Sequence, residues 1–182
     1  MVQHYFIGFK IPEKQATQLD EIRSTWNLQT THKVIPHASD LHVTLLYLGP
    51  VEDKDMKTLT ERLEKLQDDL PSLNLTITGF SSFGSPKNPR VVFASLEKEP
   101  KLKLLQKNVK TIAESIPFKL DKKPYVPHIT LAKKWIGQKE LNMHELKIEP
   151  LIVEIKQFSI FSIHPQKIPS YIAVKTIQLK DE

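Results

Sequence analysis

Apolar residues recur along this chain at two spacings, and each spacing predicts one kind of element. Apolar positions three or four residues apart are typical of an amphipathic helix. This spacing predicts helices over Pro12–Asn27, Asp53–Asp69 and Lys101–Ile116, with a further short helix over Leu141–Leu146. Leu28–Asp40 is polar and contains a proline, so it is expected to be a loop.

Runs that are rich in β-branched and aromatic residues, or that alternate between apolar and polar residues, predict strands elsewhere. The predicted strands are Val2–Lys10, Leu41–Leu48, Leu73–Phe80, Arg90–Ser95, Tyr125–Ala132, Val153–Ile163 and Ser170–Leu179. Helices and strands alternate too irregularly for a parallel doubly wound sheet. We therefore predict an α+β fold of mostly antiparallel sheets with helices packed outside.

Composition narrows the class of protein. The 182 residues are 40% hydrophobic and 26% charged, and no linker or low-complexity tract divides them, so one domain over residues 1–182 is expected. The chain has no cysteine, which excludes disulfides, thiolate nucleophiles and sulfur-ligated metal centres. No stretch approaches the roughly 20 apolar residues of a membrane span, and we expect a cytoplasmic protein without membrane contact.

Charge and glycine content bear on the ligand. The net charge of +5 favours an anionic partner such as nucleic acid. The alternative is that the surface lysines only keep the protein soluble. The five glycines are not clustered, so the chain lacks a phosphate-cradling loop of the nucleotide-binding kind. No run of residues has the spacing of metal ligands, and we predict neither a metal nor a cofactor.

One tetrapeptide pattern occurs twice. His42–Leu45 and His128–Leu131 both read His, a β-branched residue, Thr and Leu, and both lie in predicted strands. A His-x-Thr pair alone is a weak signal. The β-branched residue and the leucine in both copies make coincidence much less probable, and they indicate two lobes of similar construction.

Strand geometry places the polar residues of each copy together. Residues i and i+2 share a face, so His42 projects with Thr44, and His128 with Thr130. The opposite face of each strand is apolar and is expected to pack into the core. Two lobes related by an approximate two-fold axis would bring both polar faces into one central cleft.

Two imidazoles and two hydroxyls suit the in-line cleavage of a phosphodiester. One histidine can take a proton from the attacking oxygen while the other gives one to the departing oxygen. The hydroxyls can donate hydrogen bonds to the non-bridging oxygens as charge develops. A single histidine would more simply be a hydrogen-bonded strand residue, but the pairing of two copies favours catalysis.

At these residues the chain resembles the two-histidine (2H) phosphoesterase superfamily, within its 2′-5′ RNA ligase-like (LigT-like) branch of bacterial RNA 2′,3′-cyclic phosphodiesterases. The resemblance covers nearly the whole chain. It rests on Tyr5–Pro12, Asp40–Gly49, Arg90–Phe93, Pro127–Ala132 and Tyr171–Leu179. It implies a bilobal fold around a cleft, no metal, and opening of 2′,3′-cyclic phosphate RNA ends to 2′-phosphomonoesters.

The resemblance also implies roles for particular residues. His128 matches the base and His42 the acid, with Thr44 and Thr130 beside them. Tyr47 matches an aromatic position that stacks on the terminal base. In a regular strand Tyr47 would instead face the core, and a bulge or the strand's end would be needed to turn it toward the cleft.

Lys133 stands where the family often has an arginine. Lysine keeps the charge that binds phosphate but loses the bidentate geometry of a guanidinium. Lys133 and its neighbour Lys134 could also be ordinary surface charges. Arg90 opens a strand after a turn, and its sequence context does not assign it to the site. The remaining histidines are expected to be surface or packing residues: His4, His32, His37, His144 and His164.

The expected partner is an RNA or oligonucleotide end that carries a 2′,3′-cyclic phosphate, bound by a monomer. Some family members also join or cleave 2′-5′ linkages. A 2′-5′ oligonucleotide or a small cyclic nucleotide is an alternative substrate for the same cleft. A non-catalytic RNA-end binder is the alternative from another class, and it predicts salt-sensitive binding without turnover.

Overall fold

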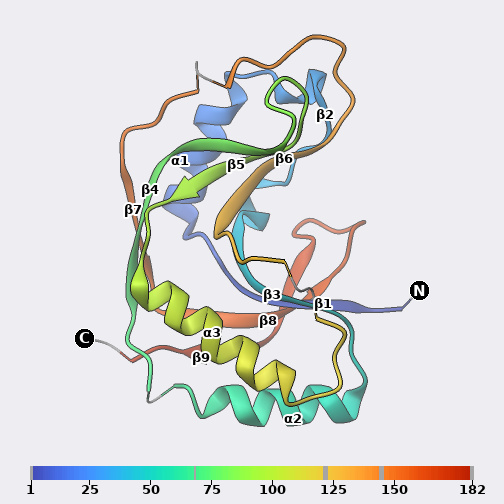
Figure 1. The fold of residues 1–182 in the computed structure, drawn as a ribbon, viewed down its shortest axis with the longest axis vertical. Helices are drawn as coiled ribbons and strands as arrows, with labels where there is room; N and C mark the ends of the chain where they lie inside the picture. Colours follow the sequence, from blue (N-terminus) through green and yellow to red (C-terminus); the bar gives the residue numbers. More distant parts are fainter. Residues whose placement is uncertain (1, 68, 121–122, 144–145, 181–182) are drawn as a thin grey trace.

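The computed structural model describes residues 2–67, 69–120, 123–143 and 146–180. Within these ranges nine strands form one sheet, and three α-helices lie outside it (Figure 1). The strands are β1 (His4–Lys10), β2 (His32–Val34), β3 (His42–Pro50), β4 (Leu73–Gly84), β5 (Pro89–Leu96), β6 (His128–Trp135), β7 (Leu151–Ile155), β8 (Gln157–Ile163) and β9 (Tyr171–Gln178). The helices are α1 (Glu13–Ser24), α2 (Asp53–Glu64) and α3 (Pro100–Glu114).

The sheet has two halves that meet at its centre. Its strand order is β7-β4-β5-β6-β3-β1-β8-β9, with β2 added beside β6, and every strand pair is antiparallel. The central strands β3 and β6 pair at Val43 and Ile129. An antiparallel pair has a local two-fold axis at such a point. The predicted α+β fold with a pseudo-two-fold arrangement is therefore confirmed.

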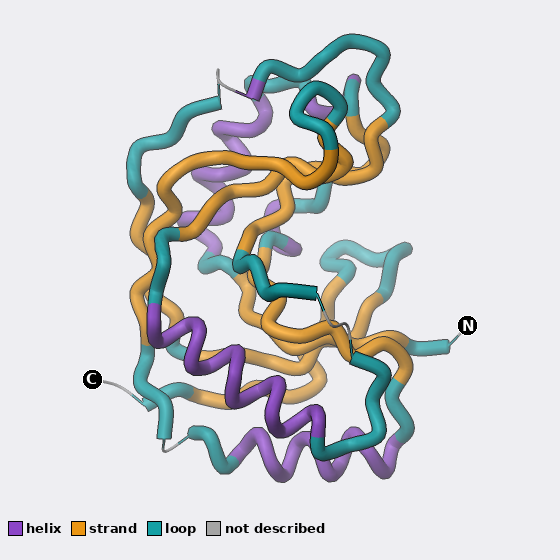
Figure 2. The backbone as a smooth tube through the Cα atoms, viewed as in Figure 1, coloured by secondary structure: helices purple, strands orange, loops and turns teal. Residues whose placement is uncertain are grey.

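Helices cover the outer face of both halves. In Figure 1, α2 and α3 lie together beneath the half that contains β3, β1, β8 and β9. Helix α1 belongs to the other half, where its Arg23 donates a hydrogen bond to the carbonyl of Leu131 in β6. The tube in Figure 2 shows the strands of both halves as one curved layer.

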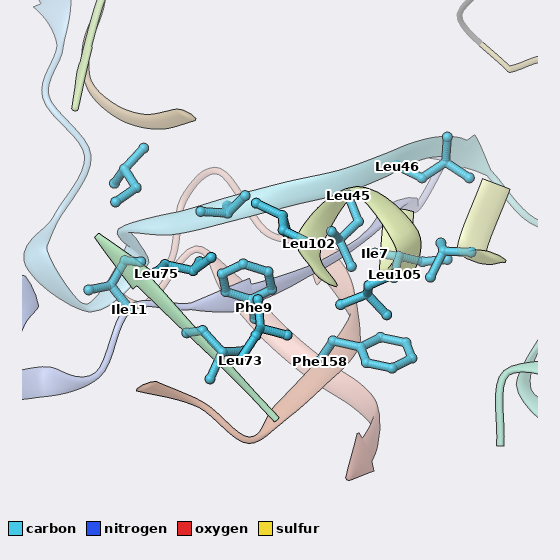
Figure 3. Packing of buried hydrophobic residues seen from close by; sticks show 14 of the residues in the cluster. Ile7, Phe9, Ile11, Leu45, Leu46, Leu73, Leu75, Leu102, Leu105 and Phe158 are labelled. Atoms are coloured by element: carbon cyan, nitrogen blue, oxygen red, sulfur yellow. The ribbon is translucent and has the colours of Figure 1, made fainter. Parts of the chain in front are cut away.

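The main core lies between the helices and the sheet. Leu102 and Leu105 of α3 pack over Phe9, Leu45 and Phe158 (Figure 3). These side chains are almost completely buried, and burial of a large apolar side chain contributes about 1.5–3 kcal/mol. The apolar face of each central strand is thus held against the core, which leaves its polar face on the opposite side of the sheet.

Most predicted elements are present, and two differ because of strand pairing. The predicted loop Leu28–Asp40 contains strand β2, which pairs with β6, and two short 3-10 turns. A three-residue polar strand has no periodicity that a sequence can reveal. The predicted strand Val153–Ile163 is two strands separated by Lys156, since β7 pairs with β4 while β8 pairs with β1 and β9.

Element ends also differ from the predictions. The second helix ends at Glu64 because its last predicted turns tighten into i to i−3 hydrogen bonds. Strand β4 continues to Gly84, beyond its predicted end at Phe80, and β6, which is predicted to begin near Pro127, runs from His128 to Trp135. The helix predicted over Leu141–Leu146 includes positions outside the described residues. No helix in the described part of the chain is long and apolar enough to cross a membrane.

Candidate active site

His42 opens strand β3 with its ring held at one nitrogen. Nδ1 lies 2.6 Å from the carbonyl oxygen of Asp40. A carbonyl can only accept, so Nδ1 carries a proton, and in the neutral ring Nε2 is the free acceptor. Nε2 lies 3.1 Å from the hydroxyl of Thr44 and accepts a hydrogen bond from it.

His128 opens strand β6 in the same way. Its Nδ1 donates to the carbonyl of Val126 at 2.7 Å. In both strands the acceptor is thus the carbonyl two residues before the histidine. The same tautomer is selected twice, and in both rings Nε2 is the atom that can exchange a proton with a ligand.

The pairing of β3 with β6 places both motifs on one face. Because Val43 is opposite Ile129, extending the register by one residue puts His42 opposite Thr130 and Thr44 opposite His128. Val43 and Ile129 are completely buried on the core side, whereas the four polar residues are partly exposed on the other. The structure therefore brings together the two histidines and two threonines that the sequence singles out.

A β-bulge follows each motif and reverses the direction of the next side chains. The pairing of β3 with β1 has a separate irregularity at Leu48, near the end of the strand. At the motifs themselves, Leu45 of β3 has no partner in β1, and Leu131 of β6 has no partner in β5. Each of these is the leucine of the repeated tetrapeptide, and each is buried together with the residue after it. The position five residues after each histidine consequently returns to the histidine's face.

Tyr47 and Lys133 occupy these two equivalent positions. Tyr47 is 49% exposed and lies opposite Phe6, whose ring contacts His42. Its phenol oxygen is 2.5 Å from Nδ1 of His4. The bulge is thus the feature needed to turn Tyr47 away from the core. Lys133 lies at the opposite end of the face, because β3 and β6 run in opposite directions.

Aromatic rings surround each histidine, and the sequence motifs do not indicate them. His42 has Phe6 at 4.8 Å and Tyr171 at 4.7 Å between ring centres. The rings that contact His128 are Phe83 at 5.0 Å and Phe93 at 5.2 Å. These aromatic residues come from β1, β9, β4 and β5, so only the strand order brings them to the histidines.

Burial lowers the pKa of three groups at the face, His42, His128 and Lys133. Burial is the main cause that lowers the pKa of His42 to about 4; the charges of Lys133 and His128 act in the same direction, while the Asp40 carbonyl and carboxylate oppose the shift. Burial likewise lowers the pKa of His128. The pKa of Lys133 falls through burial and repulsion by Lys134. Such shifts concentrate at functional sites.

Asp40 is a buried carboxylate beside His42 that the sequence does not single out. It accepts hydrogen bonds from the backbone N–H groups of Ser170 at 2.8 Å and Tyr171 at 3.2 Å, and it pairs with Lys10 at 3.8 Å. Its carbonyl also holds His42. Asp40 therefore ties the start of β9, with the Tyr171 ring, to the start of β3.

A groove of about 660 Å³ adjoins the His42 end of this face. We call it the lysine groove. It is lined by residues 34–37, by Asp40, by Lys133 and Lys134, and by Ile163, Pro165, Gln166, Lys167, Ile168, Ser170 and Tyr171. A second groove of about 540 Å³ lies at the Tyr47 end. Both of them border the candidate site without containing its histidines.

The other candidate residues lie away from this arrangement. Arg90 is exposed at the beginning of β5. His32 is buried and hydrogen-bonded to the Pro89 carbonyl, and His164 is hydrogen-bonded to Ser162. His144 is outside the described residues. Across the described ranges, no group of three or more His, Asp or Glu side chains is placed to hold a metal ion.

Known proteins resemble this chain along most of its length. RNA 2′,3′-cyclic phosphodiesterase of Bacillus subtilis (strain 168) is 29% identical over 177 residues, which cover 97% of this chain and 96% of that protein. The protein of the same name from Thermotoga maritima is 26% identical over 159 residues, 86% of this chain and 84% of that protein. These relatives are enzymes by name, so the prediction of an enzyme family is confirmed.

A solved structure shares the fold. The crystal structure of E. coli LigT complexed with 3′-AMP superposes with a TM-score of 0.81 at 20% identity, covering 98% of this chain and 99% of that one. The sequence model of the 2′-5′ RNA ligase superfamily matches residues 11–161, which include both histidine motifs. This chain therefore belongs to the 2′-5′ RNA ligase superfamily of two-histidine phosphoesterases.

Proposed function

We propose that the protein hydrolyses RNA ends that carry a 2′,3′-cyclic phosphate, with His42 and His128 as the proton-transfer pair. The observation that carries the proposal is the matched setting of the two rings. Each is fixed through Nδ1 by the carbonyl two residues earlier, and both lie on one face of the central strand pair. The names of the relatives from Bacillus subtilis and Thermotoga maritima support the substrate class.

In the proposed reaction, water attacks phosphorus while Nε2 of one imidazole takes its proton. The bond from phosphorus to the departing ribose oxygen breaks, and the other ring, protonated at Nε2, supplies the proton to that oxygen. The product is a 2′-phosphomonoester with a free 3′ hydroxyl. Thr44, Thr130 and the ammonium of Lys133 are proposed to stabilise the charge on the phosphoryl oxygens.

The two rings differ in how readily they are protonated. Family resemblance assigns His128 as base and His42 as acid. The low pKa of His42 favours the opposite order, because the ring with the lower pKa is the one that is neutral and can accept a proton. We therefore propose His42 as the base and His128 as the acid, with the bound phosphate anion raising the pKa of both rings.

The decisive test is product analysis of a cyclic-phosphate oligoribonucleotide after incubation with the purified protein and a chelator. We expect a 2′-phosphomonoester. In the His42→Ala and His128→Ala variants kcat should fall by about 10²–10⁴, the contribution of general acid–base catalysis, while both variants remain folded. The matched control is His164→Ala, a histidine hydrogen-bonded to Ser162 outside the site, which should keep its turnover.

Near-normal hydrolysis in both single variants would rule out the mechanism. Salt-sensitive RNA binding with no turnover in the unmodified protein would instead favour the non-catalytic RNA-end binder. Comparing the cyclic-phosphate oligonucleotide with a 2′-5′ dinucleotide separates the remaining alternative. If a 5′ hydroxyl replaces water in the same geometry, the P–O3′ bond breaks in the same way and the two ends are joined by a 2′-5′ linkage, and this is the proposed origin of any ligase activity.

A further inference from the structure

The lysine groove has the charge and position of a binding site for a nucleic acid strand. Lys133, Lys134 and Lys167 all line it. None of the three has a carboxylate within ion-pair distance among the described residues. Lys133 is an ammonium held partly out of water, and burial lowers its pKa. A desolvated cation without a partner is costly, and an anionic ligand offsets that cost.

The one carboxylate in the lysine groove is already neutralised. Asp40 accepts two backbone N–H hydrogen bonds and pairs with Lys10, so it presents little free negative charge to a ligand. The groove at the Tyr47 end is different. It has the exposed carboxylate of Glu52 and the half-buried carboxylate of Asp55 beside Lys119 and His4. Of the two grooves that border the histidines, the lysine groove therefore suits a polyanion better.

The lysine groove also offers surfaces on which a base can rest. Ile35 is 36% exposed and Ile168 is 75% exposed, and both line the groove together with Tyr171. Exposed apolar side chains between unpaired lysines are typical of surfaces that bind single-stranded nucleic acid, where contact with bases is combined with contact to phosphates.

Ribose geometry sets the direction of the strand. In a 2′,3′-cyclic nucleotide the phosphate spans C2′ and C3′, while the base at C1′ and the 5′ carbon at C4′ are attached at opposite ends of the ring. A cyclic phosphate between His42 and His128, with its base toward Tyr47, thus directs its 5′ chain toward Lys133. Lys133 is close enough to His42 for its charge to lower the pKa of that ring.

We propose that the lysine groove binds the nucleotides upstream of the cyclic phosphate, with Lys134 and Lys167 on their phosphates, and that the substrate is consequently an oligoribonucleotide rather than a mononucleotide. This inference rests on the proposed function, since the cyclic phosphate anchors the strand at the histidines. Lys134 and Lys167 are exposed and outside the reacting centre, so they govern the preference for length.

The test compares cytidine 2′,3′-cyclic phosphate with di- and trinucleotides that end in the same group. In the unmodified protein kcat/KM should rise with length. In Lys134→Gln/Lys167→Gln the ratio of trinucleotide to mononucleotide kcat/KM should fall by about tenfold, and the slope of log KM against log salt should fall by about 1.4 for two lost phosphate contacts. The control is Lys103→Gln/Lys107→Gln, two exposed lysines on α3.

A binding measurement separates this inference from the proposed function. Fluorescence anisotropy with a labelled 3′-phosphorylated trinucleotide requires no turnover. Binding that depends on Lys134 and Lys167 without hydrolysis of any substrate would support the lysine groove and overturn the function. Hydrolysis that is equal for all lengths and unaffected by the double variant would overturn the groove and leave the function intact. Absence of both binding and hydrolysis would overturn both.

Discussion

At the scale of single residues, the site depends on which ring nitrogen is free. The backbone carbonyls of Asp40 and Val126 fix the proton of each histidine at Nδ1. No side-chain substitution can remove these carbonyls, so the orientation of the rings is a property of the strand ends. The aromatic rings around them supply the burial that lowers each pKa.

We expect the pH dependence of activity to reflect these shifts. The kcat/KM reports the free enzyme, in which the base must be neutral and the acid protonated. With the pKa of His42 at about 4 and that of His128 below its ordinary 6.5, kcat/KM should be bell-shaped with a maximum below pH 6.5. The profile of kcat should lie at higher pH, because the bound phosphate anion raises the pKa of both rings.

Steady-state kinetics from pH 4 to 9 with the cyclic-phosphate oligonucleotide would measure both profiles. A kcat/KM that keeps rising above pH 7 would contradict the proposed roles, since neither imidazole would then be titrating as the essential acid.

Sequence alone could identify the polar residues of the site but not their surroundings. The strand period places each histidine with its threonine, and the structure brings the two pairs together. The ring contacts of Phe6, Phe93 and Tyr171 depend on which strands are neighbours. Asp40 acts through a segment about 130 positions away, which no local pattern can reveal.

At the scale of elements, the two bulges decide what the central strands present. The carbonyl of each bulged leucine accepts a hydrogen bond from a helix. Leu131 accepts from the buried Arg23 of α1 at 3.1 Å, and Leu45 accepts from Gln106 of α3 at a long 3.5 Å. Helices α1 and α3 thus each supply a polar partner where a bulge interrupts the hydrogen bonding between strands. The run of apolar residues in each strand hides this irregularity from sequence analysis.

A substitution at Gly8 should test how tightly β1 holds β3. A Cβ atom at Gly8 would clash with the backbone oxygen of Val43, which lies within the first motif. Gly8→Ala must therefore separate the strands. We expect a loss of about 1–3 kcal/mol in the free energy of unfolding, as for other overpacked sites, together with a lower kcat because His42 moves. Denaturant unfolding and steady-state kinetics would measure these effects.

Gly79→Ala is the matched control for this substitution. Gly79 is also a strand glycine, in β4, but a Cβ atom there would meet nothing within 4 Å. Its replacement should leave kcat unchanged and stability equal or slightly higher, since alanine restricts the unfolded chain. If the two variants had equal kcat values and equal free energies of unfolding, the contact between β1 and β3 at Gly8 would not be tight.

At the scale of the whole molecule, local patterns predict the fold class and most elements, and long-range pairing explains what they miss. The chain leaves one half of the sheet and enters the other at Lys156, within a run that reads as one strand. Residues His32–Val34 form strand β2 because they can pair with the end of β6 at Lys133 and Trp135. Neither feature has a signal in the residues concerned, since both depend on partners elsewhere.

Stability should fall on acidification because the site buries neutral histidine. The pKa of His42 is about 4 in the folded protein and near 6.5 when the chain unfolds. Between these values the unfolded state binds the proton that the folded state excludes, so the contribution is complete above pH 6.5 and is lost as pH falls toward 4. It amounts to about 3 kcal/mol.

Urea unfolding of the unmodified protein and of His42→Gln at pH 7, 6, 5 and 4 would measure this contribution. The difference between the two proteins should grow toward low pH in favour of the variant, which has no proton to exclude. If the free energies of unfolding of the two proteins changed with pH in parallel, the pKa of His42 would not be lowered by folding.

The matching bulges give the site two ends with different chemistry on one scaffold. The same slot, five residues after the histidine, holds a phenol in β3 and an ammonium in β6. A ligand that is itself asymmetric, aromatic at one end and anionic at the other, fits such a cradle in a single sense. Two halves of similar construction therefore bind such a ligand in one orientation only, and exchanging Tyr47 with Lys133 would be expected to reverse that orientation.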